Sequence, residues 1–124
     1  MSEEKIIIEF ENYLFGIKGK KEGIIKMPKE YYTLTNERLK INKQGLITQT
    51  RSDLELFKIK DMTVKQKMKD KVLNIGDIEI ISADESDPLL VLKNIKDPHG
   101  IREKIRDASK YAKEKAGVSY KYEL

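Results

Sequence analysis

The fold is decided by the stretch Glu30-Tyr31-Tyr32-Thr33-Leu34-Thr35-Asn36-Glu37-Arg38-Leu39-Lys40-Ile41-Asn42. Its first half is rich in aromatic and β-branched residues, which favour a pleated strand. Its second half alternates polar and apolar side chains, which indicates a half-buried strand. Asn36-Glu37 between them is a good two-residue turn. We therefore expect a β-hairpin with one buried face, formed by Tyr32, Leu34, Leu39 and Ile41.

More strand-like runs follow the hairpin. They occupy residues 46–56, 59–68, 77–82 and 89–95, and turn-forming residues separate them. Lys43-Gln44-Gly45 is the first of these turns, with Gly45 available for a positive φ. The last run, Leu89-Leu90-Val91-Leu92-Lys93-Asn94-Ile95, is apolar enough to predict a strand covered on both faces.

A single amphipathic helix is expected after the strands. Asp97 can cap its first amide groups, and Pro98 fits the first helical position because its missing N–H donor has no partner there. One apolar stripe recurs at helical spacing and consists of Ile101, Ile105, Ala108 and Ala112. Gly117 is expected to end the helix.

Strands first and one helix last predict a mainly β fold, a small sandwich or barrel of bent antiparallel sheets capped by the C-terminal helix. At 124 residues the chain fits one domain. We place an N-terminal extension at residues 1–29, packing on or pairing with the domain, the domain itself at residues 30–117, and a tail at residues 118–124. The tail is expected to be a stray strand or disordered.

The order of these motifs resembles the bacterial pleckstrin-homology-like (PH-like) domain family. The resemblance covers roughly residues 30–110. It is carried by Tyr31-Tyr32-Thr33-Leu34-Thr35, Glu37-Arg38-Leu39, Lys43-Gln44-Gly45-Leu46, Asp53-Leu54-Glu55-Leu56, Ile59-Lys60-Asp61-Met62, Gly76-Asp77-Ile78-Glu79-Ile80 and Asp97-Pro98.

The resemblance implies a PH-like barrel whose open corner is plugged by the last helix, and no enzyme activity. PH-like folds serve as platforms for lipids, peptides or self-assembly. In eukaryotic lipid-binding members the loop between the first two strands is basic. The corresponding loop here, Asn36-Glu37, is short and not basic, so the usual phosphoinositide site does not carry over to any residue of this chain.

The residues themselves offer no catalytic, metal or cofactor site. There is no cysteine, and the one histidine, His99, cannot anchor an ordinary zinc site alone. We take His99 as a surface or packing residue. No serine lies in a Gly-x-Ser-x-Gly elbow. Asp84-Glu85-Ser86-Asp87 lacks the ligand spacing of a calcium loop and is interpreted as an acidic turn.

We expect a non-enzymatic protein without a cofactor. We also expect a cytoplasmic location, because neither an apolar membrane span nor a signal peptide is recognisable.

Charge is unevenly distributed along the chain. The net charge is +4, but residues 31–71 carry +5, residues 72–95 carry −4 and residues 96–124 carry +3. Such a polarised field can steer charged partners or align subunits. If the run 59–68 continues as a regular strand, one face of it carries Lys65, Lys67, Lys69 and Lys71, which is a candidate binding surface for an anionic partner. The alternative is that these lysines protect an exposed strand edge.

The N-terminal segment is the second candidate surface. Ile6, Ile7, Ile8 and Phe10 are more apolar than a loose tail requires. They either cover the domain's own sheet or pair with a second subunit or partner by strand addition.

Our leading hypothesis is a module that mediates protein interaction, including self-association. The alternative is peripheral binding to anionic lipid headgroups through the lysine face. We do not expect nucleic-acid binding, because aromatic residues are not interleaved with the lysines.

Overall fold

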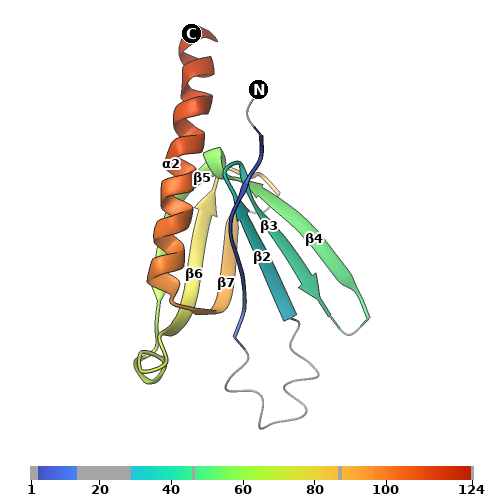
Figure 1. Ribbon diagram of the computed structural model, residues 1–124, viewed down its shortest axis with the longest axis vertical. Coiled ribbons are helices and arrows are strands. Elements are labelled where there is room, and N and C mark those ends of the chain that lie inside the picture. Colours follow the sequence, from blue (N-terminus) through green and yellow to red (C-terminus); the bar gives the residue numbers. More distant parts are fainter. Residues whose placement is uncertain (1–2, 14–28, 46, 87, 124) are drawn as a thin grey trace.

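The computed structural model of the chain describes residues 3–13, 29–45, 47–86 and 88–123, and for residues 118–123 the backbone alone. Within these ranges, seven antiparallel strands form a four-stranded sheet, β1-β2-β3-β4, and a three-stranded sheet, β5-β6-β7 (Figure 1). The strands are β1 (Ile6–Glu11), β2 (Lys29–Thr35), β3 (Arg38–Gln44), β4 (Gln49–Glu55), β5 (Ile59–Lys65), β6 (Ile75–Ser82) and β7 (Leu89–Lys96). Two 3₁₀ turns, η2 (Leu56–Lys58) and η3 (Met68–Asp70), and the helix α2 (Pro98–Glu123) complete the chain.

The predicted hairpin is confirmed as β2 and β3. Tyr32 lies opposite Ile41 and Leu34 opposite Leu39, and all four side chains are buried. The side-chain oxygen of Thr35 closes the turn by accepting hydrogen bonds from the backbone N–H groups of Glu37 and Arg38, at 3.0 and 2.9 Å. The turn is thus held by a buried hydroxyl group as well as by the strand pairing.

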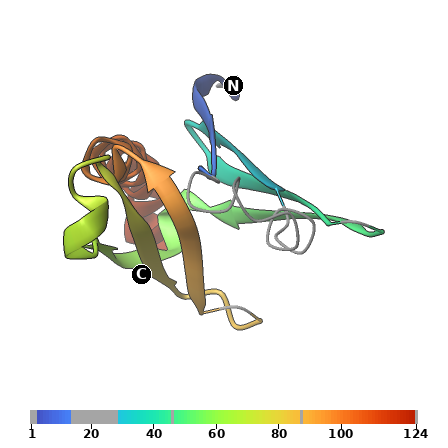
Figure 2. The same cartoon turned by 90° about the horizontal axis from the view of Figure 1, so that it is seen from below.

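The two sheets meet at an angle, and α2 lies on the side of the β5-β6-β7 sheet (Figure 2). At one corner a bridge between Asn12 and Ile95 joins the end of β1 to β7, and the Tyr13 amide donates to the Asn94 carbonyl at 2.6 Å. The predicted mainly β fold with a C-terminal helix is therefore confirmed. The sheets are not closed into one continuous barrel within the described ranges.

A bulge shapes β7. Gly76 pairs with Ile95 and Ile78 pairs with Leu92, so two residues of β7 oppose one of β6. Asn94 takes up the extra residue with φ 55°. Leu92 and Ile95 consequently both point into the core, where they are 0% and 1% exposed. The prediction that this strand is covered on both faces was wrong, because its outer face remains open and Leu89 is exposed.

The helix begins where the sequence predicts. The Asp97 carboxylate accepts from the Gly100 amide at 3.3 Å, and the Asp97 carbonyl accepts from the Ile101 amide. Ile101, Ile105 and Ala108 are buried, and Ala112 packs beside them. One core therefore joins both sheets to the helix stripe.

Several boundaries differ from the prediction. α2 continues through Gly117 to Glu123, so the expected tail is helical over residues 118–123, while Leu124 lies outside the described residues. The run 46–56 forms a strand only from Gln49, and its last residue, Leu56, enters η2. Gly45 has no positive φ. In the predicted N-terminal extension, β1 pairs with β2, and residues 14–28 lie outside the described residues. The connection between the first two strands is therefore residues 12–28, and the prediction that it is Asn36-Glu37 was wrong, since that turn joins β2 to β3.

Candidate functional site

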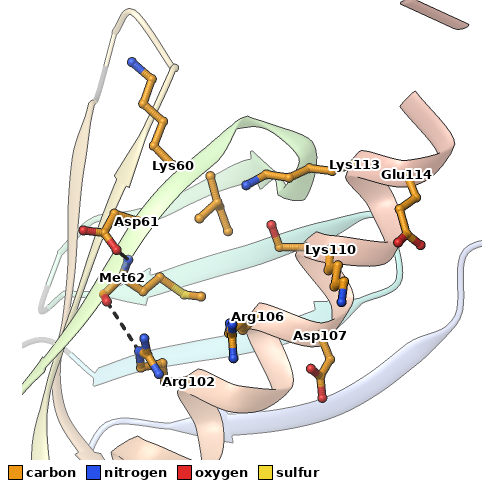
Figure 3. A pocket seen from close by; sticks show the side chains of 11 residues that line it. Lys60, Asp61, Met62, Arg102, Arg106, Asp107, Lys110, Lys113 and Glu114 are labelled. Carbon is orange, nitrogen blue, oxygen red and sulfur yellow. Dashed lines mark hydrogen bonds between the residues drawn. The ribbon is translucent and has the colours of Figure 1, made fainter. Parts of the chain in front are cut away.

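A groove lies between β5, an edge strand of its sheet, and the outer side of α2 (Figure 3). Its volume is about 500 Å³. Ile59, Met62 and Ser109 are buried at its floor, and the Ser109 hydroxyl donates to the Leu56 carbonyl at 2.9 Å. This hydrogen bond fixes the helix against η2, so the two walls of the groove are held at a defined separation.

Cations outnumber carboxylates along the groove. Five basic side chains line it, and three acidic ones lie among them. The basic residues are Lys60, Arg102, Arg106, Lys110 and Lys113, and the acidic residues are Asp61, Asp107 and Glu114. Figure 3 shows that all but Lys60 and Asp61 come from α2. The apolar stripe of the helix faces the core, and its basic neighbours therefore form one wall of the groove.

The free edge of β5 is partly occupied by its own side chains. The backbone N–H of Met62 donates to the Asp61 carboxylate at 2.8 Å, and its carbonyl accepts from Arg102 Nε at 3.4 Å. A strand that added to this edge at Met62 would have to displace both contacts. The groove is therefore better suited to bind charged side chains of a partner than to extend the sheet.

The one strongly shifted acid in the described part of the chain lies elsewhere. Burial of Tyr32 raises its pKa far above its ordinary value, and its hydrogen bond to Glu30 adds to the shift. The Tyr32 ring stacks on Phe10 with centroids 5.0 Å apart. Tyr32 thus fastens β1 to β2 inside the core and has no access to a ligand.

Arg38 lies at the start of β3. The nearby Glu4 carboxylate, 3.0 Å from Nε, raises the pKa of Arg38, and Asp53 at 3.4 Å acts in the same direction. The guanidinium group therefore already has carboxylate partners within the chain.

The four candidate lysines do not share a strand face. β5 ends at Lys65, and Lys67, Lys69 and Lys71 lie in the connection to β6 around η3. The predicted continuous lysine face was wrong for this reason. All four side chains are exposed, and Lys65 forms an ion pair with Glu79 at 3.2 Å.

The N-terminal candidates divide into two pairs. Ile8 and Phe10 pack against the core, whereas Ile6 and Ile7 are 62% and 46% exposed. A register shift between Ile6 and Ile8 accounts for the change. β1 is also an edge strand. Both predicted roles of this segment, covering the domain's own sheet and pairing with a strand of a partner, therefore have a structural basis.

The sequence did not reveal the groove. Its walls come from residues 59–62 and 102–114, and nothing in either segment alone indicates that they meet. The only signal was the row of basic residues beside the apolar stripe of the helix. His99 is exposed, and Asp84 forms a local turn by accepting from the Ser86 amide at 3.0 Å.

Two bent antiparallel sheets sealed by a C-terminal helix define a domain of the PH-like class. The family model described as Bacterial PH domain matches residues 24–109 of this chain. The chain therefore belongs to the bacterial PH domain family. PH-like domains are in general binding or scaffold modules without catalytic activity. Comparisons with curated proteins and with solved structures gave no match.

Among the described residues, no helix is both long enough and apolar enough to cross a membrane. No cluster of three or more His, Asp or Glu side chains suitable for a metal ion was found in the same residues.

Proposed function

We propose that this protein is a non-enzymatic interaction module that binds an acidic segment of a partner protein in the groove between β5 and α2. The observation that carries the proposal is the excess of cations around a buried floor that includes Ile59 and Met62, next to an edge strand. Basic side chains on both walls complement carboxylates of a bound segment, and such complementarity favours association and selects against basic partners.

The geometry of Met62 limits the mode of binding. Because Asp61 and Arg102 already hold its backbone groups, the partner makes side-chain contacts with Arg106, Lys110 and Lys113. A short segment held mainly by exposed charges binds weakly, since pairs exposed to water contribute only about 0–1 kcal/mol each. We expect a micromolar complex that weakens as salt is raised.

The test is charge reversal in the groove. Arg106→Glu combined with Lys110→Glu is expected to weaken binding of acidic synthetic peptides at least about tenfold, because two attractive pairs become repulsive. Fluorescence anisotropy against a panel of acidic, neutral and basic peptides measures the effect. The panel is followed by affinity capture and mass spectrometry to identify cellular partners.

Lys40→Glu with Lys104→Glu is the matched control. Both lysines are exposed, neither lines the groove, and the change in net charge is the same. The control should bind like the wild type. Equal losses in the two variants, or no preference of the wild type for acidic peptides, would contradict the proposal.

A second candidate function, self-association, is favoured by β1. This strand lies at a sheet edge and exposes Ile6 and Ile7. Two copies can pair β1 with β1 around a two-fold axis and continue the sheet from one subunit to the next. Because β1 has only six residues, the shared surface is small, and the dimer should dissociate at low concentration.

Ile6→Lys with Ile7→Lys should abolish this dimer, since charged lysines on an edge strand oppose pairing. Sedimentation velocity at several protein concentrations gives the dissociation constant. Ile81→Lys with Tyr111→Lys is the control, because these exposed residues lie on the central strand β6 and on α2. A wild-type protein that stays monomeric at high concentration rules out the β1 dimer.

A further inference from the structure

The outer face of the four-stranded sheet carries a hollow with a volume of about 470 Å³, a size that is usual for small-ligand sites. This outer hollow lies over β2, β3 and β4, which are neighbours in the sheet (Figure 1). Tyr32, Leu39 and Leu54 are buried on the inner face, so the residues that alternate with them point outward. Outward side chains of all three strands line the hollow, among them Tyr31, Thr33, Lys40, Asn42, Arg51 and Asp53.

One row of the strand register crosses the outer hollow from an aromatic ring to a cation. Tyr31 pairs with Asn42, and Asn42 pairs with Arg51. Since neighbouring strands lie about 4.8 Å apart, the backbones of Tyr31 and Arg51 are about 10 Å apart. Tyr31 is 40% exposed, and Arg51 is exposed as well. The pairing therefore aligns an accessible ring, an amide and a guanidinium group across three strands.

Two cations of the outer hollow are available to a ligand. Lys40 lies opposite Asp53 in the register, but the Asp53 carboxylate pairs with Arg38 at 3.4 Å. Arg38 is also paired with Glu4, at 3.0 Å. Within the described ranges, no ion pair includes Lys40 or Arg51. The β3 and β4 side of the hollow therefore has two positive charges that the protein itself does not neutralise by an ion pair.

The side chain of Asn42 is oriented by β4. Its amide oxygen accepts a hydrogen bond from Gln49 Nε2 at 3.1 Å. Its amino group has no hydrogen-bond partner among the residues that the structure describes. Because Gln49 occupies the oxygen, Asn42 offers a hydrogen-bond donor to a ligand located between Tyr31 and Arg51.

The other side of the Tyr31 ring is acidic. A smaller depression there is lined by Glu9 and Glu11 of β1 together with Tyr31. Glu11 is paired with Lys29 at 2.5 Å, and Lys29 Nζ lies 5.9 Å from the centroid of the Tyr31 ring. The charge of the outer face thus changes from negative at β1 to positive at β3 and β4. A ligand with one anionic end binds with that end toward β4.

We propose that the outer hollow binds a purine nucleoside monophosphate. The base stacks on Tyr31, the Asn42 amino group donates to N7 of the base, and the phosphate lies between Lys40 and Arg51. Aromatic side chains stack on the planar face of any base, whereas N7 is an acceptor that adenine and guanine share and pyrimidines lack. Lysine and arginine are the usual partners of a phosphate group. The site lies outside the groove between β5 and α2 and does not depend on the proposed peptide binding.

Two other ligands fit the outer hollow less well. A single strand of nucleic acid needs a continuous basic track, but Glu9 and Glu11 follow directly beyond Tyr31. An anion without a base leaves the Tyr31 ring and the Asn42 donor unused. Along the sequence, aromatic residues and lysines are not interleaved, and only the pairing of β2, β3 and β4 brings Tyr31 into line with Arg51.

Titration of the full chain with AMP and GMP, followed by ¹⁵N chemical shifts, tests the proposal. We expect dissociation constants of about 0.1–1 mM, because a hollow open to water buries only part of the ligand. The amides that shift should belong to β2, β3 and β4. UMP and CMP should bind about threefold or more weakly, since they lack the N7 acceptor. Adenosine and ribose 5-phosphate should each bind about tenfold or more weakly than AMP, because one lacks the phosphate and the other the base.

Substitutions separate the two ends of the ligand. Tyr31→Leu should weaken AMP binding about fivefold or more through the loss of stacking, whereas Tyr31→Phe keeps the ring and should retain binding. Lys40→Gln with Arg51→Gln should weaken AMP binding about tenfold or more and remove most of its dependence on salt.

Matched controls carry the same changes elsewhere on the surface. Tyr111→Leu removes another exposed tyrosine, and Lys93→Gln with Lys104→Gln removes two other exposed cations. None of these residues lines the outer hollow, so both control variants should bind AMP like the wild type. The groove variant Arg106→Glu with Lys110→Glu should also retain AMP binding.

Four results would overturn the proposal. The first is an unchanged spectrum of the wild type at about ten times the expected dissociation constant. The second is equal binding of AMP, UMP and ribose 5-phosphate, which would indicate contact with an anion alone. The third is loss of AMP binding in the groove variant or in the controls to the same extent as in the Lys40 and Arg51 variant. The fourth is binding of single-stranded oligonucleotides without binding of mononucleotides.

Discussion

Replacing Ile105 by alanine should lower the free energy of unfolding by about 2–5 kcal/mol, the usual cost of truncating a large buried aliphatic side chain. Ile105 is 0% exposed and belongs to the core cluster that includes Leu39 of the first sheet and Ile80 of the second. Because the sheets are not closed into a continuous barrel, the helix stripe fills the opening between them. The alanine variant leaves an apolar cavity. Water does not fill such a cavity, and the surrounding side chains close it only in part.

Helix propensity cannot account for this loss, since alanine favours helix more than isoleucine does. Urea unfolding followed by circular dichroism gives the measurement, with the midpoint lowered and the slope unchanged. Lys104→Ala is the control because Lys104 is exposed on the same helix, and its effect should stay within about 0.5 kcal/mol. A loss below about 1 kcal/mol for Ile105→Ala would show that α2 does not seal the core.

The sequence predicted correctly those elements in which the local residue pattern specifies the same structure as the packing in the folded protein. In the β2-β3 hairpin, the alternation, the turn residues and the buried face all specify the same structure, and the pairing of Tyr32 with Ile41 follows directly. The start of α2 is similar, because Asp97 and Pro98 mark the boundary chemically. Both predictions needed only residues close together in the sequence.

The lysine run shows where local pattern is insufficient. A period of two in residues 65–71 fits an exposed strand and an exposed turn equally well. The strand ends because η3 and Asn74, with φ 54°, redirect the chain toward β6. Asn74 in turn is fixed by contacts with Gln66 and Asp97. These contacts join segments distant in sequence, so the end of β5 could not be read from the run itself.

Gly117 illustrates the opposite error, because here the predicted end of an element was placed too early. Glycine often ends helices, but a glycine with an ordinary φ can also lie within one at a modest entropic cost. Among the described residues, no heavy atom from outside its own stretch of helix lies within 4 Å of the position of a Cβ at Gly117, and the backbone continues to Glu123. The groove was missed for a further reason, since it exists only once β5 and α2 are packed together.

Gly76→Ala should destabilise the protein by about 1–3 kcal/mol or more, the range typical of overpacking a filled site. An added Cβ would lie 2.8 Å from the Lys65 carbonyl oxygen, 2.6 Å from Gln66 Cγ and 3.2 Å from Pro98 Cγ. Gln66 has a flexible side chain that can move. The Lys65 carbonyl belongs to the end of β5 and cannot move without disturbing its pairing with β6.

Gly76 is therefore needed for space and not for an unusual backbone conformation, since its φ is not positive. Gly117→Ala is the matched control, because the same added methyl group meets open space there. Replacing glycine within a helix should stabilise the protein by about 0.5–1 kcal/mol. Chemical unfolding of the two variants should thus give shifts of opposite sign in the free energy of unfolding.

Gly76→Ala combined with Gln66→Ala should recover only part of the lost stability, because the contact with the Lys65 carbonyl remains. Full recovery in the double variant would show that the side chain of Gln66, and not the approach of β5 to β6 and α2, sets the requirement for glycine.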